Sequence, residues 1–453
     1  MKVFGSSGVR GVVNEEITPA FVGRVALAAG STFESGTVAV ARDTRRTGEM
    51  LADAAAAALA ATGADVHRLG VLATPGAQAY AEREGVPVVM VTASHNPPEY
   101  NGVKLVGADG VELSRDTLER VEDRLLAERF DEVPWDATGE SRRVESARRE
   151  YVEGLLAAID RDRIADADLT VALDPGHGAG ALTSPAFFRE LGCRVVTVNA
   201  QPDGRFPGRD PEPVAANLGD LGDLVRAADA DVGVAHDGDA DRAIFYDETG
   251  TYIEGDATLA ALSEAALDAG DTTVSAVNVS QRLVDVAERT GATLELTPIG
   301  STNIITRIRE LAAEGHHVPV AGEGNGGVLF PDYRLARDGA YTAARFLELL
   351  ADRTASEAVA DYDGYANVRE NLGYDTDGER EAMLAAAERY AGSADATPTT
   401  IDGYRLDYGD AWVLARPSGT EPVVRVYAEA AERDRATELA SEFRDALADA
   451  RDR

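Results

Sequence analysis

The stretch TVAVARDTRRTGEMLADAAAAALAATGADVHRLGVL, residues 37–72, carries the pattern that decides the fold. Residues 37–43 are predicted to form a strand, 47–64 a helix that ends near Gly63, and 65–72 a second strand. A further helix (77–85) and strand (86–94) follow. This alternation of strands and helices predicts a mostly parallel sheet covered by helices.

The alternation restarts twice and then changes. A second cycle begins at residues 168–180 and a third at 271–280, whereas residues 402–430 are β-rich and precede a helix. We therefore expect three similar α/β domains and a different fourth domain, with boundaries at 1–148, 149–252, 253–362 and 370–453. The polar segment 131–150 and the Gly/Asp-rich segment 361–378 are interpreted as linkers.

The charge of the chain is extreme. Among 453 residues there are 44 basic and 79 acidic ones, which gives a net charge of −35 and a pI near 4.5. Such a surface repels nucleic acid and anionic lipid, so we expect neither as a partner. Lys2 and Lys104 are the only lysines. Arginine in place of lysine and abundant Asp and Glu favour a protein adapted to high salt, where exposed charges are screened.

Several classes of protein are disfavoured by what the sequence lacks. A single cysteine, Cys193, allows neither an intrachain disulfide nor a thiolate metal cluster, and its setting is typical of a small core residue. The first residues have no apolar core of a signal peptide, and no run of about 18 apolar residues is present. We therefore expect a cytoplasmic protein without a membrane span.

The motif DGDADR, residues 237–242, predicts a metal site. Asp237, Asp239 and Asp241 alternate after an apolar strand, so their carboxylates can converge on one point. Such convergence is unfavourable without a cation, and oxygen ligands prefer Mg²⁺ or Ca²⁺ to Zn²⁺. An EF-hand is excluded because the loop lacks its glutamate, and a solvated acidic turn is the simpler alternative.

Ser94 ends an apolar strand in VTASHNPPEYNGVKL, residues 91–105. The carboxyl ends of strands are where open α/β sheets bind ligands. No GxSxG elbow is present, and His95 is poorly placed as the base of a triad because it is the next residue. A serine beside a carboxylate metal site instead suggests phosphoryl chemistry on that serine.

Three further segments combine small residues with groups that bind anions or hydroxyls. RPSGTEPVVRV (416–426) brings two arginines, hydroxyls and backbone amides together, which suits a phosphate, although an ordinary hairpin would read similarly. GEGNGG (322–327) places Glu323 and Asn325 between glycines, and GSSGVRG (5–11) surrounds Arg10 with small residues; each is weak alone.

Taken in order along the whole chain, these motifs resemble the α-D-phosphohexomutase superfamily, and most closely its archaeal phosphoglucosamine mutase group. The resemblance implies three related α/β domains with mixed sheets plus a smaller C-terminal α+β domain, arranged around a central cleft. It also implies a small-molecule sugar phosphate as the ligand and a monomer or homodimer.

The resemblance implies a phosphoserine enzyme. Ser94 carries a phosphoryl group and, with Asp237, Asp239 and Asp241, holds one Mg²⁺. The resemblance further implies that glucosamine 6-phosphate accepts this phosphoryl group and becomes a bisphosphate, which returns its 6-phosphoryl group to the enzyme and leaves as the 1-phosphate, with a sugar bisphosphate as primer. Catalytic roles fall to Ser94, Lys104, Arg10 and His95. Positions expected to bind substrate are Arg242, Gly300, Ser301, Glu323, Asn325, Arg416, Ser418, Gly419, Thr420 and Arg425.

The chain departs from the bacterial pattern GExSGH, because Gly327 stands where that pattern has a histidine linked to acid/base work. We expect Lys104 or His95 to take this role, since the pKa of a lysine can be tuned whereas arginine stays protonated. PIGSTN (298–303) matches the specificity loop but does not fix the sugar. A glucose/mannose phosphate mutase is the main alternative; a serine phosphatase and a sugar-phosphate sensor are remote ones.

Overall fold

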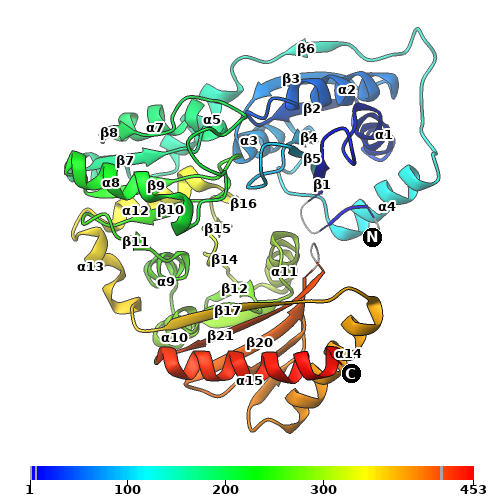
Figure 1. Cartoon of the computed structure of the whole chain (residues 1–453). Helices are drawn as coiled ribbons and strands as arrows, with labels where there is room; N and C mark the ends of the chain where they lie inside the picture. Colours follow the sequence, from blue (N-terminus) through cyan, green and yellow to red (C-terminus); the bar gives the residue numbers. More distant parts are fainter. Residues whose placement is uncertain (1–2, 6–7, 419–421, 453) are drawn as a thin grey trace. The chain divides into compact units, whose positions relative to one another are not determined.

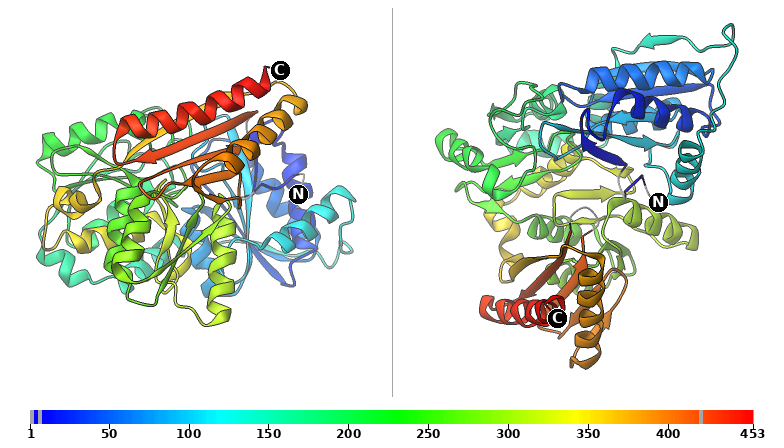
Figure 2. Two further views of the ribbon diagram at one scale, coloured as in Figure 1. Left: turned by 90° about the horizontal axis from the view of Figure 1, so that it is seen from below. Right: turned by 45° about the vertical axis from the view of Figure 1, so that its right-hand side comes forward.

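The computed structural model describes residues 3–5, 8–418 and 422–452, which form two compact units. The first unit comprises the chain up to Thr258 together with Asn325–Val359. The second comprises Leu259–Gly324 and the chain from Ala360 onward. Figure 1 labels the elements of both units and Figure 2 gives two further views.

The first sheet of the first unit has six strands in the order β1-β5-β4-β2-β3-β6. Pairing is parallel between β2 and both β3 and β4, and antiparallel between β5 and both β4 and β1. The elements of this region are β1 (Val9–Val12), α1 (Pro19–Gly30), β2 (Thr37–Arg42), α2 (Gly48–Ala61), β3 (Asp65–Val71), α3 (Thr74–Glu84), β4 (Val88–Val91), β5 (Tyr100–Val106), α4 (Arg115–Leu126), β6 (Ser141–Arg143) and α5 (Ala147–Ala157).

Helices cover both faces of this sheet, with α1, α2 and α4 on one face and α3 and α5 on the other (Figure 1). Alternate residues of β2 therefore enter different cores: Val38 and Val40 pack under α1 and α2, whereas Ala39 and Ala41 pack under α3. Burial on both faces explains why the strand reads as a continuous apolar run.

The second sheet has the order β11-β10-β9-β7-β8. Pairing is parallel between β7 and both β8 and β9, and antiparallel between β10 and both β9 and β11. Two 3₁₀ turns, Ala179–Leu182 and Ala215–Asn217, interrupt its connections. Its elements are α6 (Arg161–Asp166), β7 (Thr170–Asp174), α7 (Ser184–Glu190), β8 (Arg194–Thr197), α8 (Gly219–Ala228), β9 (Val232–Ala235), β10 (Ile244–Tyr246) and β11 (Tyr252–Ile253).

The third α/β region contributes to both units. In the second unit β12 pairs in parallel with β13 and β14, and in the first unit β15 pairs antiparallel with β16. Its elements are α9 (Gly255–Ala266), β12 (Thr272–Ala276), α10 (Gln281–Thr290), β13 (Thr293–Thr297), α11 (Ser301–Glu314), β14 (Ala321–Glu323), β15 (Gly327–Phe330), β16 (Arg334–Arg337), α12 (Gly339–Leu349) and α13 (Ala355–Val359).

The C-terminal region is an antiparallel sheet in the order β17-β21-β20-β19-β18. Helices α14 and α15 pack together and cover one face of it (Figure 2). Its elements are a 3₁₀ turn (Ala360–Tyr362), β17 (Ala366–Gly373), α14 (Asp377–Ser393), β18 (Thr397–Thr399), β19 (Tyr404–Asp407), β20 (Ala411–Pro417), β21 (Val423–Ala430) and α15 (Arg433–Arg451).

This architecture confirms the predicted class of three α/β regions with mixed strand directions and a smaller α+β region. The two linker predictions are wrong in part. Residues 141–143 form β6, which pairs with β3, and residues 366–373 form β17, which pairs along its length with β21. Both strands lie at sheet edges and have no buried residue, so they lack the apolar pattern that marks a strand.

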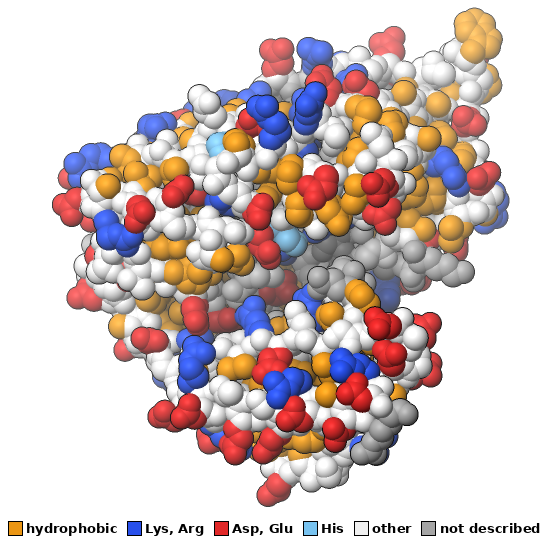
Figure 3. Space-filling model, viewed as in Figure 1, with side chains coloured by type: hydrophobic (Ala, Val, Ile, Leu, Met, Phe, Trp, Pro, Cys, Tyr) orange, Lys and Arg blue, Asp and Glu red, His pale blue; other side chains and the backbone are white. Residues whose placement is uncertain are grey.

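Two properties of the surface and core agree with the composition. Asp and Glu side chains are dispersed over the visible face of both units, as Figure 3 shows. Cys193 is buried directly before β8, and burial raises the pKa of its thiol to about 12. Among the described residues, no helix has the length and apolarity that crossing a bilayer requires.

Candidate active site

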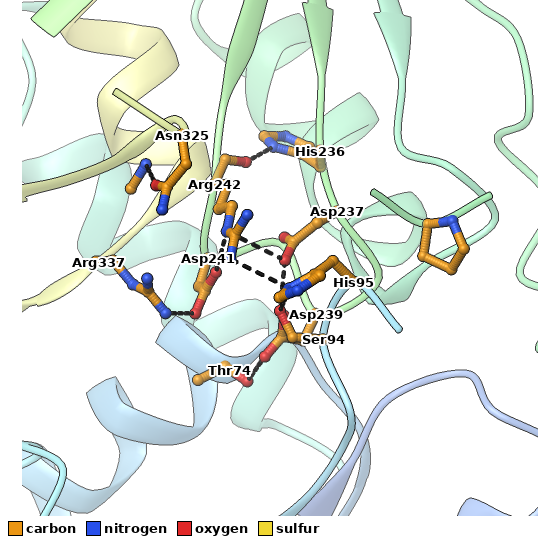
Figure 4. A network of polar contacts seen from close by, with 12 residues as sticks. Thr74, Ser94, His95, His236, Asp237, Asp239, Asp241, Arg242, Asn325 and Arg337 are labelled. Carbon is orange, nitrogen blue, oxygen red and sulfur yellow. Dashed lines mark hydrogen bonds and ion pairs between the residues drawn. The ribbon is translucent and has the colours of Figure 1, made fainter. Parts of the chain in front are cut away.

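Ser94 lies in the first unit, three residues after the end of β4. Its side chain is fully buried, and its Oγ donates a hydrogen bond of 2.7 Å to Asp237 Oδ2 (Figure 4). The backbone of Ser94 has φ +51°, a left-handed conformation that residues other than glycine rarely adopt. Such strain outside glycine is concentrated at functional sites because the surroundings must hold it in place.

The three aspartates converge, as their spacing indicates. Asp237, Asp239 and Asp241 follow β9, are all buried, and offer one oxygen each within 4.8 Å of one another. Ala240 has φ +57°, so the loop turns between the last two carboxylates. Oδ1 of each aspartate has no hydrogen-bond partner among the described side and main chains. Three buried oxygens without partners fit a hard divalent cation, which would supply the missing interactions.

Lys104 of β5 contacts two of these carboxylates. Its Nζ lies 3.0 Å from Asp239 Oδ2 and 3.1 Å from Asp241 Oδ2, and its side chain is 1% exposed. Burial alone would lower the pKa of this amine, but Asp239, Asp241 and Glu112 outweigh burial and the pKa is raised. The ammonium group is therefore held as a counter-ion, the opposite of the direction that a general base requires.

Two arginines flank Asp241. Arg337, at the end of β16, donates from Nη2 to Asp241 Oδ2 at 2.6 Å, and Arg242 Nε lies 3.9 Å from both Asp241 and Asp237. Burial would raise the pKa of Asp241, but Arg337, Lys104 and Arg242 lower it.

Asp237 has less compensation. Burial and the neighbouring carboxylates Asp239 and Asp241 raise its pKa to about 8, and Arg242 only partly offsets them. Three buried cations, Lys104, Arg242 and Arg337, face the three carboxylates, but Lys104 and Arg337 contact Asp239 and Asp241. Asp237, the carboxylate that Ser94 contacts, has only Arg242 at 3.9 Å and is the least compensated of the three.

His95 is a neutral imidazole here. Its Nδ1 lies 3.1 Å from Arg242 Nη2 and 3.5 Å from Ser94 Oγ. The charge of Arg242, then burial and then Arg10 lower the pKa of His95 to about 2. Arg10 comes from β1 and donates to Asn96 Oδ1 at 3.2 Å; burial lowers the pKa of its guanidinium.

The missing side chain at Gly327 leaves room for Arg337. A Cβ at this position would lie 2.7 Å from Arg337 Cδ, so the arginine side chain fills the space beside the glycine. Asn325, exposed in this structure, accepts the Gly327 N–H at 3.0 Å. The group next to the glycine is therefore a permanent cation bound to Asp241 rather than a titrating side chain.

The remaining predicted residues belong to the second unit. Gly300 has φ +126° before α11, whose first residue Ser301 is buried, and Glu323 ends β14 as a buried side chain. Gly419 and Thr420 lie outside the described residues. Ser418 N–H closes the β20–β21 hairpin by donating to Val423 O at 2.8 Å.

Arg416 and Arg425 are direct cross-strand neighbours in this hairpin. Like charges in opposite positions destabilise a strand pair, and an anion bound by both relieves the repulsion. Arg416 Nε pairs with Asp402 Oδ2 at 3.1 Å, and the same carboxylate oxygen accepts the N–H of Ile299 at 3.1 Å. Asp402 therefore connects the PIGSTN loop (298–303) to the β20–β21 hairpin.

Sequence reasoning missed Thr74 and Arg337. Thr74 begins α3 and donates to Asp239 Oδ2 at 2.6 Å, while Arg337 binds Asp241 from β16. Thr74 follows the predicted strand 65–72 and so stands at a carboxyl end like Ser94, which is a usable indication. The sequence gives no such indication for Arg337, because only tertiary packing brings β16 beside the aspartate loop.

A buried serine beside three converging carboxylates that could hold a metal ion, in a protein of three α/β regions and a β-rich fourth, fits the class of enzymes that transfer phosphoryl groups. Four sequence profiles identify it further. They are described as phosphoglucomutase/phosphomannomutase α/β/α domains I, II and III and the C-terminal domain, and they match residues 1–132, 149–250, 254–365 and 366–446. The chain belongs to the phosphoglucomutase/phosphomannomutase family, an enzyme family of phosphohexomutases, which confirms the resemblance.

Similar proteins cover nearly the whole chain. A phosphoglucomutase/phosphomannomutase of Thermococcus kodakarensis is 40% identical over 96% of each chain. A protein of Methanopyrus kandleri named "Probable phosphoglucosamine mutase" is also 40% identical, over 98% of this chain and 97% of its own. A crystal structure of a family member from Burkholderia thailandensis has a TM-score of 0.86 at 28% identity and covers 99% of this chain and 97% of that one.

Proposed function

We propose that this phosphohexomutase interconverts glucosamine 6-phosphate and glucosamine 1-phosphate through a phosphoserine at Ser94. The observation that carries the proposal is the 2.7 Å contact from Ser94 Oγ to Asp237, beside three buried carboxylate oxygens that accept no hydrogen bond from any described residue. The name of the Methanopyrus relative and the archaeal form of the GEGNGG motif favour the amino sugar.

In the proposed reaction the bond between the phosphoryl phosphorus and Ser94 Oγ breaks as the sugar O1 attacks that phosphorus. The proton of the O1 hydroxyl goes to a base in the site, and Ser94 is left as an alkoxide that takes up a proton. In the second half the 6-phosphoryl group moves to Ser94 Oγ, the steps reverse at O6, and glucosamine 1-phosphate leaves. The net change is isomerisation, so no phosphate is released.

Asp237, Asp239 and Asp241 would hold Mg²⁺, since Oδ1 of each accepts no hydrogen bond from the part of the chain that the structure describes. When bound, the ion neutralises charge on the phosphoryl oxygens during transfer. Lys104 and Arg337 keep Asp239 and Asp241 ionised and in place, and Arg10 and Arg242 bring positive charge to the Ser94 loop. Sugar hydroxyls would bind Glu323 and Asn325, and the non-reacting phosphate would bind the Arg416–Arg425 hairpin.

A glucose/mannose phosphate mutase is the second candidate, favoured by the name of the Thermococcus relative. The test is a panel of glucosamine, glucose and mannose 6-phosphates, assayed with Mg²⁺, the matching bisphosphate and high salt. We expect the highest kcat/KM with glucosamine 6-phosphate. A tenfold preference for glucose or mannose phosphate would replace the assignment by the second candidate, and release of phosphate without isomerisation would reject both. A monomer or homodimer stays the prediction for the assembly.

A further inference from the structure

Arg45 is a buried arginine whose five N–H groups are all used. Nε donates to Asp43 Oδ2 at 3.0 Å, and neither side chain is exposed. The other four donors reach main-chain carbonyls of a single segment, the loop that carries Ser94; these are Ser94 O (2.9 Å), Asn96 O (2.6 Å), Pro97 O (2.6 Å) and Tyr100 O (3.1 Å). Arg45 thus uses its whole guanidinium group to hold one loop.

The Arg45–Asp43 ion pair also fixes the N–H of Ser94, through Thr92. Thr92 Oγ1 donates to Asp43 Oδ2 at 2.7 Å and accepts the Ser94 N–H at 2.9 Å. Ser94 is therefore held at its N–H through Thr92 and at its carbonyl by Arg45. A left-handed residue other than glycine costs about 1–3 kcal/mol, so such fixed contacts are what maintain it.

Arg209 repeats this arrangement in the second sheet. Its Nε donates to Asp174 Oδ2 at 2.9 Å, and Asp174 ends β7 as a fully buried residue. Its Nη2 donates to the carbonyl of His236 at 2.6 Å. His236 directly precedes Asp237, so this bond fixes the peptide from which the first metal-binding carboxylate projects.

Gly204 and Phe206, which shortly precede Arg209 in the chain, pack against Arg45. The ring of Phe206 lies with its centroid 5.1 Å from the Arg45 guanidinium carbon. Gly204 packs so closely on the main chain of Arg45 that a Cβ would lie 2.4 Å from its Cα. Gly238 of the aspartate loop packs directly against the Ser94 loop, because a Cβ there would lie 2.5 Å from Ser94 O and 3.6 Å from Phe206.

We propose that Arg45 and Arg209 are positioning residues for phosphoryl transfer, which together set Ser94 Oγ against Asp237. The inference rests on the proposed phosphoserine chemistry and adds residues that touch neither substrate nor metal. Each arginine holds the main chain of one catalytic loop, and Phe206 with its glycines keeps the two loops in register. A displacement of about 1 Å in such a geometry is enough to lower a rate by about 100-fold.

The test replaces each arginine by lysine, which keeps the charge beside Asp43 or Asp174 but loses the planar fork. For Arg45→Lys and Arg209→Lys we expect kcat to fall about 10- to 100-fold while KM for the sugar phosphate changes less than about threefold. Single-turnover transfer from phosphorylated Ser94 should slow by the same factor as kcat. Since both arginines act on one distance, the double variant should lose less than the product of the single losses.

Arg282→Lys is the matched control. Arg282 is a buried arginine of the second unit that donates to the carbonyls of Tyr362 (2.6 Å) and Tyr365 (3.0 Å). We expect it to lower Tm about as much as Arg45→Lys but to retain kcat. If Arg45→Lys lowers Tm and keeps kcat as the control does, the role of Arg45 is structural only and the inference is overturned.

Thr92→Val is the second variant and covers the case in which Arg45→Lys does not fold. It removes the hydroxyl between Asp43 and the Ser94 N–H and should lower kcat with KM unchanged; unchanged kcat would also overturn the inference. Failure of the proposed function is seen separately, because the wild-type protein would then show no mutase turnover with any sugar phosphate.

Discussion

The Ser94 hydroxyl makes one strong contact, to Asp237, so its removal should affect chemistry far more than folding. For Ser94→Ala we expect kcat to fall by about 10³-fold or more, because the nucleophile is lost. The far-UV circular dichroism spectrum and Tm should stay close to those of the wild type. Ser263→Ala is the control, since this serine is equally buried and its hydroxyl has no partner among the described residues; wild-type turnover in Ser94→Ala would refute the role of Ser94.

Asp237 is the carboxylate with the least compensation, so its charge should destabilise the metal-free protein. For Asp237→Asn we expect a higher Tm than the wild type in EDTA, because a repulsion is removed while Asn Oδ1 still accepts from Ser94. Added Mg²⁺ should raise the Tm of the wild type, since a ligand of the native state stabilises it, and should raise that of the variant far less.

Differential scanning fluorimetry with and without Mg²⁺ measures both effects. Asp247→Asn is the control, because Asp247 is also buried but accepts its side-chain hydrogen bonds, within the described residues, from the amides and hydroxyl of its own turn. Equal Mg²⁺ shifts in the wild type and Asp237→Asn would show that the cation does not bind these carboxylates.

Spacing along the chain was sufficient to predict that Asp237, Asp239 and Asp241 converge and that Ser94 follows a buried strand, although β4 ends at Val91, three residues earlier than predicted. It was insufficient for groups that reach the site from other elements. Arg337 and Thr74 come from β16 and α3, and Arg45 reads in sequence as one of many arginines. The lysine at 104 was noticed, yet its raised pKa depends on two carboxylates more than 130 residues away.

At the scale of elements, the β20–β21 hairpin brings Arg416 and Arg425 side by side. For Arg425→Ala we expect KM for the sugar phosphate to rise about tenfold or more, with a smaller effect on kcat, because a charge-assisted contact to the phosphate is lost. Calorimetric titration with glucosamine 6-phosphate measures the affinity directly. Arg369→Ala, an exposed arginine of the adjacent strand β17, should leave it unchanged; an equal loss in both variants would argue for a general charge effect.

The elements that were predicted well are those buried on two faces. The observed bounds of β2, α2 and β3 agree closely with those predicted within residues 37–72, because apolar runs and helical periodicity dominate there. β17 escaped prediction because its residues alternate between half-buried and exposed at the edge of a sheet. The assumed linker at 361–378 therefore contains a strand, residues 366–373, that its partner β21 rather than its own composition stabilises.

At the scale of the whole molecule, a net charge of −35 opposes folding at low ionic strength. We propose that the chain is adapted to high salt and expect Tm to rise by several degrees as KCl increases from about 0.1 M to about 1 M, since the Debye length falls from ~10 Å to ~3 Å. Sucrose at equal osmolality is the control and should raise Tm less. A Tm that falls or stays constant in KCl would contradict the proposed adaptation.

The central claim is that Ser94 carries the phosphoryl group, and intact-mass spectrometry tests it most directly. The purified protein is dephosphorylated, incubated with glucosamine 1,6-bisphosphate and Mg²⁺, and compared with Ser94→Ala. We predict a gain of one phosphoryl group, assigned by peptide mapping to Ser94 and removed again by excess glucosamine 6-phosphate. No gain, or a gain of equal size in Ser94→Ala, would contradict the account.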